Sequence, residues 1–363
     1  MVEGALPVGP SVDPQTGEVT FVVEAHHGAV PDSVWFHLRD FGADTSMRPE
    51  AEDSHRWLAR IPRPPVDRLE YLIAWRHPDG GTSMSPDPGN PQRIRSVFGD
   101  HSVLLFDEYR APSWLHGDAF VDGMGDAVAL AAEDPETGIA VRGALWSPHD
   151  STPDEPLPLL VANDGREYAE LADLTGFLGV MGDERPQLRC RALLLDPVDR
   201  DRSYSASPAY GRLVVDRLLP LVADERATLR RPVGMGASLG AVAILESAIS
   251  HPGVWGGLLL QSGSFFTDAF DAHESGFRWY RRLTRFAADV PAAAAAGRLD
   301  GVDVVMTCGT GEENLDNNRA LAGRLRSAGV PVELVENRDA HNYTAWRDCW
   351  DPALVGLMGR VWG

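Results

Sequence analysis

The sequence predicts an α/β protein in which a mostly parallel central sheet follows an all-β sandwich. Short β-prone runs separated by turns fill the chain up to about residue 112. Beyond that point, uninterrupted apolar runs alternate with segments of helical apolar spacing, which is typical of strands covered by helices on both faces. We therefore expect two domains, an immunoglobulin-like β-sandwich over residues 1–112 and an α/β-hydrolase domain over residues 113–363.

The N-terminal part contains several short β-prone runs at the spacing of a sandwich. Strands are expected at 17–24, 33–38, 55–61 and 69–77. The segment 85–91 has the sequence Ser-Pro-Asp-Pro-Gly-Asn-Pro, which cannot form a helix. It predicts an ordered loop that returns the chain to the second domain.

The C-terminal part begins with two apolar runs around Asp-Pro-Glu-Thr-Gly at 134–138, which predict a hairpin. Alternating elements follow. Strands are expected at 157–162, 190–195, 231–235, 257–261, 302–308 and 330–335, and helices at 166–180, 210–223, 241–250 and 317–327. This alternation favours a parallel sheet.

Composition excludes several function classes. The 363 residues are 44% hydrophobic and 24% charged, as in ordinary globular proteins, so wholesale disorder and collagen-like repeats are excluded. Basic residues number 33 and acidic residues 53, a formal charge of −20. A field of that sign repels nucleic-acid phosphates and anionic lipids. We therefore expect neither nucleic acid nor a membrane as a partner. A small-molecule substrate is expected instead.

The cysteines and the apolar runs bear on cofactors and location. Cys190, Cys308 and Cys349 are far apart and show no spacing typical of zinc sites or of a disulfide framework. We expect no metal and no other cofactor. The first residues lack the pattern of a signal peptide, and no apolar run has the roughly 18 residues of a membrane helix. A cytoplasmic protein is expected.

The candidate nucleophile lies in the run Gly-Ala-Ser-Leu-Gly at residues 236–240. This run matches G-x-S-x-G and stands between a predicted strand and a predicted helix, the context that a nucleophile elbow requires. Flanking glycines permit close packing at such a turn, and the helix N-terminus stabilises negative charge. Ser238 is therefore the expected nucleophile.

A serine hydroxyl needs a base, and in this fold the base follows the nucleophile in the chain. Three histidines qualify. His251 is expected at the end of the helix after the elbow, and His273 lies among acidic residues typical of a solvated loop. His341 follows the last predicted strand after a short loop, so it is the expected base.

The acid that orients the base is expected after the preceding strand. Glu312, Glu313 and Asp316 all stand in the segment that follows residues 302–308. Glu312 is nearest the strand end and is favoured. Glu313 and Asp316 stay open as alternatives, and the cluster also fits acidic residues that merely complement a helix dipole.

An oxyanion hole needs two backbone donors. One is the amide of Leu239, directly after the nucleophile. The other is expected from the loop after an earlier strand, where Gly165 permits a sharp turn and the amide of Arg166 is the natural donor. Asp164 is expected to accept hydrogen bonds from a substrate hydroxyl, although an ordinary Asp-Gly turn would look the same.

Five motifs in order resemble the esterase family that includes enterochelin (ferric enterobactin) esterases, feruloyl esterases and the mycolyltransferases of the antigen 85 group. They are Asn-Asp-Gly-Arg at 163–166, the elbow at 236–240, Gln-Ser-Gly-Ser-Phe at 261–265, Gly-Thr-Gly-Glu at 309–312, and His341 followed by Trp346-Arg347. The resemblance covers most of residues 113–363. It implies roles in substrate binding for Asp164, Gly165 and Trp346.

The N-terminal part points to the enterochelin esterase type, which resembles this chain in joining an immunoglobulin-like domain with an Asp-Pro-x-Asn segment to the hydrolase. Here that segment is residues 87–90. The resemblance implies cytoplasmic hydrolysis of a ferric triscatecholate trilactone, which releases iron. Departures from the family pattern are Ala241 in place of a second glycine and Asp-Ala-His-Asn at 339–342 in place of Gly-Gly-His-Asp.

We therefore expect a serine carboxylester hydrolase acting on a siderophore. A charge of −20 is unfavourable for a trianionic substrate unless a local group of arginines offsets it. The arginines considered are Arg166, Arg200, Arg202, Arg278, Arg281 and Arg282. The alternatives are a feruloyl or short-acyl esterase, an acyltransferase with the same triad and, more distantly, a non-catalytic binding protein.

Overall fold

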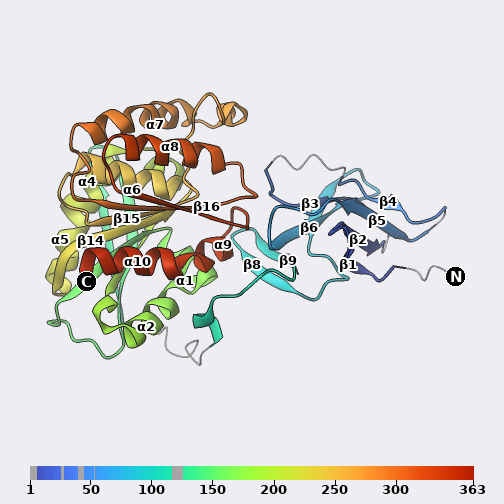
Figure 1. Ribbon diagram of the computed structural model, residues 1–363, viewed down its shortest axis with the longest axis horizontal. Coiled ribbons are helices and arrows are strands. Elements are labelled where there is room, and N and C mark those ends of the chain that lie inside the picture. Colours follow the sequence, from blue (N-terminus) through green and yellow to red (C-terminus); the bar gives the residue numbers. More distant parts are fainter. Residues whose placement is uncertain (1–5, 26–27, 40–44, 53, 117–125) are drawn as a thin grey trace. The chain divides into compact units, whose positions relative to one another are not determined.

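The computed structural model describes residues 6–25, 28–39, 45–52, 54–116 and 126–363. These residues form two compact units (Figure 1). The first unit contains the chain up to Arg110 together with residues 310–313 and 338–342. The second unit contains residues 111–309, 314–337 and 343–363. Two short loops from the C-terminal part of the chain therefore belong to the first unit.

The first unit is built of antiparallel strands in two sheets. One sheet has the order β1-β2-β5-β4, and the other has the order β3-β6-β9-β8 with β7 paired to β6. The strands are β1 (Gly9–Val12), β2 (Val19–Glu24), β3 (Val30–Trp35), β4 (Arg48–Pro49), β5 (Arg56–Ile61), β6 (Arg68–Arg76), β7 (Thr82–Ser85), β8 (Arg93–Ser96) and β9 (Gly99–Leu105). Every pairing is antiparallel.

Apolar side chains from both sheets form the core of this unit, as expected for a sandwich. Phe21 of β2 and Tyr71 of β6 are fully buried and contact each other edge to face. The four strands predicted here correspond to β2, β3, β5 and β6. The prediction of an all-β N-terminal part is confirmed.

The proline-rich loop after β7 is ordered by buried polar contacts. Asp87 accepts a hydrogen bond from the Tyr71 hydroxyl at 2.8 Å, and its amide donates to Ser102 Oγ at 2.8 Å. Asn90 Nδ2 donates to the carbonyl of Val103. The expectation that this loop returns the chain to the second domain is wrong, because it leads into β8 and the β8–β9 hairpin stays in the first unit.

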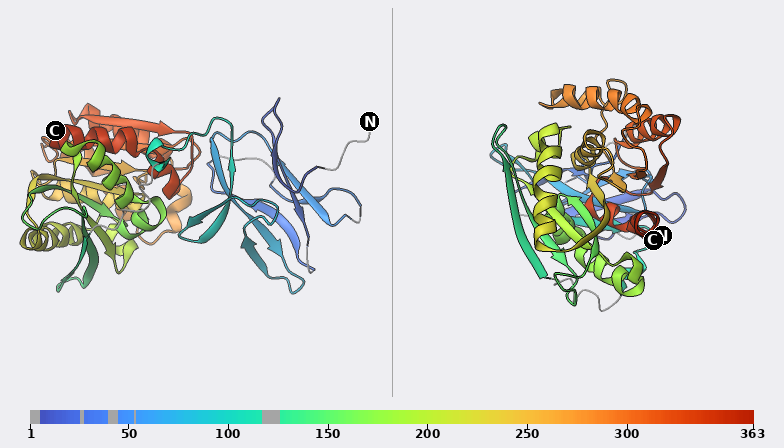
Figure 2. Two further views of the ribbon diagram at one scale, coloured as in Figure 1. Left: turned by 90° about the horizontal axis from the view of Figure 1, so that it is seen from below. Right: turned by 90° about the vertical axis from the view of Figure 1, so that its left-hand side faces the viewer.

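The second unit contains an eight-stranded sheet of order β10-β11-β13-β12-β14-β15-β16-β17. Strands from β12 to β17 run parallel, and the β10–β11 hairpin adds an antiparallel edge (Figure 2). The strands are β10 (Asp126–Asp134), β11 (Ile139–Ser147), β12 (Leu157–Asn163), β13 (Arg191–Pro197), β14 (Thr228–Ala237), β15 (Gly257–Gln261), β16 (Asp303–Gly309) and β17 (Val332–Asn337). The predicted mostly parallel sheet is confirmed.

Helices cover both faces of this sheet (Figure 1). The α-helices are α1 (Gly165–Ala172), α2 (Leu174–Glu184), α3 (Arg200–Tyr204), α4 (Pro208–Leu213), α5 (Leu219–Glu225), α6 (Leu239–Ser250), α7 (Tyr280–Ala295), α8 (Leu315–Ser327), α9 (Tyr343–Asp348) and α10 (Trp350–Trp362). Shorter turns are η1 (Ser113–His116), η3 (Pro186–Leu188), η4 (Val214–Leu218) and η5 (Ala272–Gly276).

Each face of the sheet has its own apolar core. Helices α4, α6, α7 and α8 supply side chains to one core, and α1, α2 and α10 supply side chains to the other. Strands β12 and β15 are buried along their whole length, which is why their sequences are continuous apolar runs rather than alternating ones. This arrangement brings the carboxyl ends of the parallel strands to one edge of the sheet.

The helix predicted over 166–180 is two helices. Asp173 adopts a left-handed conformation with φ 55°, which ends α1 and precedes α2. The apolar spacing continues across the break, so the pattern alone did not reveal it. The helix predicted over 210–223 is a continuous run of α4, the π-helical turn η4 and α5.

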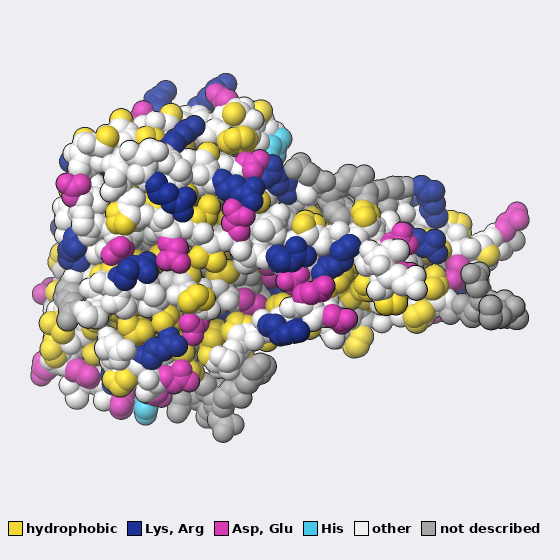
Figure 3. Space-filling model, in the orientation of Figure 1, with side chains coloured by type: hydrophobic (Ala, Val, Ile, Leu, Met, Phe, Trp, Pro, Cys, Tyr) yellow, Lys and Arg dark blue, Asp and Glu magenta, His cyan; other side chains and the backbone are white. Residues whose placement is uncertain are grey.

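Charged side chains of both signs are interspersed on the face shown in Figure 3. Among the residues that the structure describes, none of the helices has both the length and the apolar character needed to cross a bilayer.

Candidate active site

Ser238 lies in a strained turn between strand β14 and helix α6. Its backbone has φ 56° and ψ −122°, a conformation that non-glycine residues rarely adopt. The Ser238 amide donates to the Gln261 carbonyl at 2.9 Å, which ties the turn to the end of β15. Such strain persists only where the surroundings fix it, and it is typical of functional sites.

Close packing explains why residue 236 is a glycine. A Cβ atom on Gly236 would lie 2.5 Å from the carbonyl carbon and oxygen of Gly240. Any larger residue at 236 would therefore push the start of α6 away from the end of β14. A Cβ on Gly240 would lie 3.3 Å from Asn163 Cβ and from Asp164 Oδ2, a tight but smaller conflict. The close packing expected from the sequence is thus present at this turn.

A second serine hydroxyl lies beside Ser238. The Oγ atoms of Ser238 and Ser264 are 3.1 Å apart, and the Ser264 amide donates to the Ser238 carbonyl at 3.2 Å. Ser264 is buried. Sequence reasoning assigned it no role, although the run Gln-Ser-Gly-Ser-Phe at 261–265 was noted as a family motif. That motif was the available signal.

His341 and Glu312 form a short hydrogen-bonded pair within the first unit. The His341 Nδ1 atom lies 2.5 Å from Glu312 Oε2. Glu312 is completely buried, whereas the His341 side chain is 20% exposed. Because an ionised carboxylate only accepts, Nδ1 carries the proton, which leaves Nε2 as the acceptor in the neutral ring. This is the tautomer that a general base requires.

The other acids considered as partners of His341 face different groups. Glu313 Oε1 lies 3.4 Å from His37 Nε2, and Asp316 pairs with Arg319 one turn further along α8. Glu312 precedes both in the chain and is the first acidic residue after β16. Of the three acids, Glu312 is the one whose carboxylate lies against the His341 ring.

The amides of Leu239 and Arg166 both occupy first turns of helices, α6 and α1 respectively. First-turn amides have no acceptor within their own helix. The two helix starts are joined, because Asn163 Nδ2 donates to the Gly240 carbonyl at 2.8 Å. The Arg166 side chain points elsewhere, to Glu170 on the exposed side of α1.

Gly165 allows α1 to start against the neighbouring strand β13. A Cβ on this residue would lie 2.3 Å from Leu194 Cα. The preceding residue, Asp164, has a left-handed backbone with φ 53°. The chain therefore turns sharply here, as the Asp-Gly sequence predicted.

The Asp164 carboxylate is buried and held in a bidentate ion pair. Arg200 Nε and Nη2 donate to its two oxygens at 2.8 and 2.7 Å. The backbone amide of Asp164 donates a hydrogen bond to the Tyr204 hydroxyl oxygen at 2.9 Å. Burial lowers the pKa of Arg200, but the Asp164 charge and hydrogen bonds more than offset this, so the pKa lies above its ordinary value. Binding of a substrate hydroxyl by Asp164 stays a prediction.

Trp346 is buried in an aromatic cluster with Tyr168 and Tyr343. Its indole N–H donates to Ser262 Oγ at 2.9 Å, and its carbonyl accepts from Gln261 Nε2 at 3.0 Å. These contacts join α9 to the segment after β15. A role in substrate binding stays a prediction for Trp346.

The other two candidate histidines contact different groups. His251 caps the C-terminal end of α6, as expected, with Nδ1 3.0 Å from the Ser247 carbonyl. His273 lies in η5, near Glu274. All three cysteines are buried, and no disulfide joins any two of them.

The candidate arginines are engaged by separate partners. Arg281 pairs with Asp268, Arg202 donates to the Thr137 carbonyl, and Arg282 donates to the Ala206 carbonyl. Burial lowers the pKa of Arg282, and the nearby Glu246 charge offsets this only in part. Arg166 pairs with Glu170 on the exposed side of α1.

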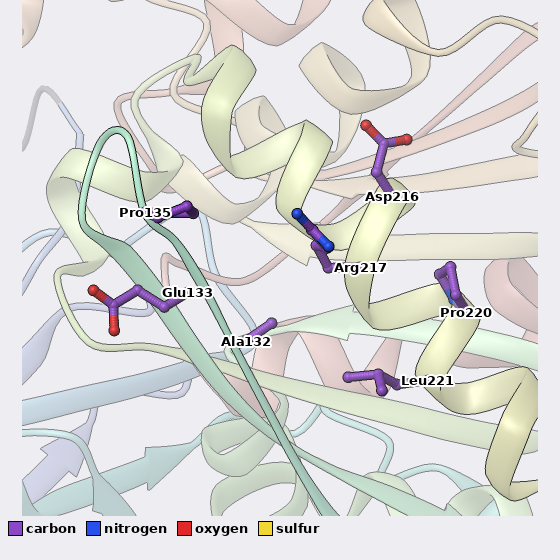
Figure 4. Close-up of a pocket in the computed structure, with 7 residues that line it drawn as sticks. All are labelled: Ala132, Glu133, Pro135, Asp216, Arg217, Pro220 and Leu221. Atoms are coloured by element: carbon purple, nitrogen blue, oxygen red, sulfur yellow. The ribbon is translucent and has the colours of Figure 1, made fainter.

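A surface hollow of about 740 Å³ lies between β10 and the helical run of η4 and α5 (Figure 4). It is lined by Ala132, Glu133, Pro135, Asp216, Arg217, Pro220 and Leu221. Its lining contains none of the site residues predicted from the sequence. We assign it no part in the chemistry.

A family model described as "Putative esterase" matches residues 135–360, more than half of the chain. The chain belongs to this esterase family. The family resemblance and the α/β-hydrolase fold predicted from the sequence are therefore confirmed, and the protein is a serine carboxylic ester hydrolase.

Proteins with known names and structures show the same likeness. The chain is 24% identical over 310 residues to the iron(III) enterobactin esterase of Escherichia coli O6:H1, covering 80% of this chain and 72% of that protein. The Shigella flexneri enterobactin esterase, crystallised in the presence of enterobactin, is 20% identical with a TM-score of 0.74 and covers 97% of this chain and 96% of its own. A ferulic acid esterase is 15% identical with a TM-score of 0.54, covering 66% of this chain and 98% of its own.

Proposed function

We propose that this esterase hydrolyses the ester bonds of a catecholate siderophore of the enterobactin type. The observation that carries the proposal is the extent of the likeness. Enterobactin esterases match both units of this chain over 97% of its length, whereas the ferulic acid esterase matches only 66%. An N-terminal sandwich joined to the hydrolase is therefore shared with the siderophore enzymes.

Ser238 is the nucleophile in this proposal. Its Oγ atom attacks an ester carbonyl while His341 Nε2 takes the hydroxyl proton. Glu312 accepts from Nδ1, keeps the ring in the required tautomer and stabilises the imidazolium that forms. The strained turn at Ser238 and the 2.5 Å His341–Glu312 hydrogen bond support these roles.

The oxyanion hole consists of the Leu239 and Arg166 amides in this proposal. Both are first-turn helix amides, and both helix starts carry partial positive charge. The hydrogen bond from Asn163 to the Gly240 carbonyl supports the proposal because it holds the two helix starts together. The oxyanion formed in the tetrahedral intermediate would accept from both amides.

The reaction then proceeds through an acyl-enzyme. Collapse of the intermediate breaks the ester bond, and the protonated imidazole gives its proton to the departing alcohol oxygen. Water, deprotonated by His341, attacks the acyl carbon and releases the acid. Successive cleavages open and shorten a trilactone, and the ferric ion leaves as cargo of the substrate.

We also propose bounds for the two domains and a location for the protein. Residues 1–112 are proposed as the sandwich domain and residues 113–363 as the hydrolase domain. Three buried cysteines with no disulfide among them fit a reducing compartment, so we propose that the protein acts in the cytoplasm.

A second candidate is a carboxylesterase acting on feruloyl or short acyl esters, or an acyltransferase with the same triad. The likeness of 66% of this chain to a ferulic acid esterase favours this candidate. A transferase differs only in the acceptor, because an alcohol rather than water would resolve the acyl-enzyme.

A substrate panel separates the candidates. Ferric enterobactin, its linear fragments, a feruloyl ester and p-nitrophenyl acetate are incubated with wild type and with Ser238→Ala, and products are separated by liquid chromatography. The proposal predicts dihydroxybenzoylserine products from wild type alone, at higher kcat/KM than for the other esters. Turnover of p-nitrophenyl acetate without any cleavage of enterobactin would contradict the siderophore assignment.

A further inference from the structure

Two loops that carry proposed catalytic residues are packed within the first unit. The loop of residues 310–313 follows β16 and carries Glu312, and the loop of residues 338–342 follows β17 and carries His341. Both loops leave strands of the second unit, yet both cluster with the sandwich. The sandwich therefore contributes to the surroundings of the base and the acid.

Backbone hydrogen bonds attach both loops to sandwich residues. The Asp67 amide donates to the Arg338 carbonyl at 2.7 Å, and the Arg39 amide donates to the Gly311 carbonyl at 2.6 Å. The loops also bond to each other, because the Gly311 amide donates to the Asp339 carbonyl at 3.0 Å. A Cβ on Gly311 would lie 2.6 Å from a methyl group of Val66, so the fit is close.

The main side-chain link is Arg68, the first residue of β6. Its side chain is 3% exposed. Nε and Nη2 donate to the two carboxylate oxygens of Asp339 at 3.1 and 3.2 Å, and Nη2 also donates to Asn342 Oδ1 at 2.6 Å. A guanidinium holds such a set of acceptors in one plane, which an ammonium cannot do.

The two acceptors of Arg68 lie on either side of His341 in the sequence. Asp339 also accepts from the Ala340 amide at 2.7 Å, and Asn342 donates from its own amide to the Ala340 carbonyl at 3.1 Å. Fixing these two residues fixes the backbone from which the imidazole projects. The position of the His341 ring against Glu312 therefore depends on this clamp.

Arg68 is itself held in place by a second carboxylate. Nη1 donates to Glu70 Oε1 at 2.6 Å, and Glu70 Oε2 lies 3.4 Å from His101 Nδ1. Burial would raise the pKa of Glu70, but Arg68 and His101 more than offset this and hold the pKa below its ordinary value. The cluster of Arg68, Glu70, His101, Asp339 and Asn342 is thus a buried and largely satisfied polar network.

We infer that Arg68, a residue of the sandwich, is a positioning residue for the general base. By holding Asp339 and Asn342 it keeps the loop of residues 338–342 in the conformation in which His341 contacts Glu312. The inference rests on the proposed function of His341 and Glu312. It gives the sandwich a part in catalysis that does not involve contact with substrate.

The test compares Arg68→Gln with Arg93→Gln. Arg93 is an exposed sandwich arginine on β8 that also holds a loop, because its guanidinium donates to the carbonyls of Asp87 and Asn90 and to Ser102 Oγ. Steady-state hydrolysis of a p-nitrophenyl ester gives kcat and KM. Fluorophosphonate titration run to completion gives the fraction of active enzyme.

If the base is misplaced, Arg68→Gln should lose kcat on the order of 10- to 100-fold, with KM little changed. Arg93→Gln should keep kcat per active site within about twofold of wild type.

The pH profile separates positioning from a merely structural role. The acidic limb of kcat/KM reports the base of the free enzyme. Moving the imidazole away from Glu312 changes its electrostatic surroundings, so Arg68→Gln should shift this limb. A variant that only lowers the folded fraction leaves the limb in place. Arg68→Lys keeps the charge without the planar fork and should recover part of kcat.

The double variant Arg68→Gln/Asp339→Asn tests the contact itself. If the two residues act as a unit, the double variant loses little more activity than the worse single variant. If Arg68→Gln fails to fold, Asp339→Asn and Asn342→Ala probe the same contact from the loop side and should shift the same limb. An unshifted limb with unchanged kcat per active site in folded variants would overturn the inference. Retained activity in Ser238→Ala or His341→Ala would instead overturn the proposed function.

Discussion

The Glu312 carboxylate accepts a hydrogen bond from His341 Nδ1 across 2.5 Å, and no part of the Glu312 side chain is exposed. A buried carboxylate in this position fixes both the tautomer and the direction of the ring. These are the properties that a serine hydrolase requires of its base and acid.

Replacing the nucleophile should abolish turnover without unfolding the protein. We predict that Ser238→Ala lowers kcat by roughly 10⁴- to 10⁶-fold, because the residual rate comes from binding and oxyanion stabilisation alone. Thermal unfolding should show no loss of stability. Ser327→Ala, at an exposed serine of α8, is the matched control and should keep full activity. A residual kcat within tenfold of wild type would contradict the role of Ser238.

Three neutralising substitutions distinguish the candidate acids. Glu312→Gln should lower kcat by roughly 10²- to 10⁴-fold, since the amide no longer stabilises the imidazolium or selects its tautomer. Glu313→Gln and Asp316→Asn should each change kcat less than about threefold, because these acids face His37 and Arg319. The kcat of each variant is measured by steady-state hydrolysis of a p-nitrophenyl ester. A larger loss in Asp316→Asn than in Glu312→Gln would reassign the acid.

Two glycines of neighbouring helices should respond in opposite ways to alanine. Gly165→Ala places a methyl group 2.3 Å from Leu194 Cα, so we predict a loss of about 1–3 kcal/mol in the free energy of unfolding, together with lower kcat. Gly179→Ala in α2 meets nothing within 4 Å and should gain up to about 1 kcal/mol from helix propensity. Urea unfolding measures both. Equal changes in the free energy of unfolding for the two variants would contradict the close packing of α1 against β13.

Alkaline pH should destabilise the protein in part through Cys190. Burial raises the pKa of this thiol to about 12, whereas an unfolded cysteine ionises near pH 8.5. Between these values the unfolded chain binds fewer protons than the folded one, so stability is present at neutral pH and falls as the pH rises. From pH 7.5 to 10 this group accounts for a loss of about 2 kcal/mol.

The comparison of wild type with Cys190→Ala checks this prediction. Urea unfolding under reducing conditions at both pH values should show a smaller alkaline loss in the variant, even though its stability at pH 7.5 is lower because of the cavity. The same alkaline loss in both proteins would contradict the prediction.

Much of the fold follows from short-range patterns. The elbow was predictable because Gly236 and its strand and helix neighbours lie within a few residues of Ser238. Continuous apolar runs revealed the buried parallel strands. The break at Asp173 was not predictable, because a non-glycine residue takes a left-handed conformation there while the apolar spacing continues across it.

The surroundings of the base were beyond the reach of sequence patterns. Arg68 and Asp339 are 271 residues apart, and no periodicity connects them. Each looks like an ordinary charged residue at the end of a strand or in a loop. The same holds for the grouping of residues 310–313 and 338–342 with the sandwich, which depends on long-range packing. His341 itself was predictable only because chain order in this fold restricts where the base stands.

Covalent labelling of Ser238 tests the central claim most directly. Wild-type protein is treated with a fluorophosphonate probe, and intact-mass and peptide spectra locate the adduct. We predict one adduct per chain on the peptide that contains Ser238, none in Ser238→Ala, and much slower labelling in His341→Ala. A wild-type protein that takes no label, or one labelled equally after Ser238→Ala, would contradict the account.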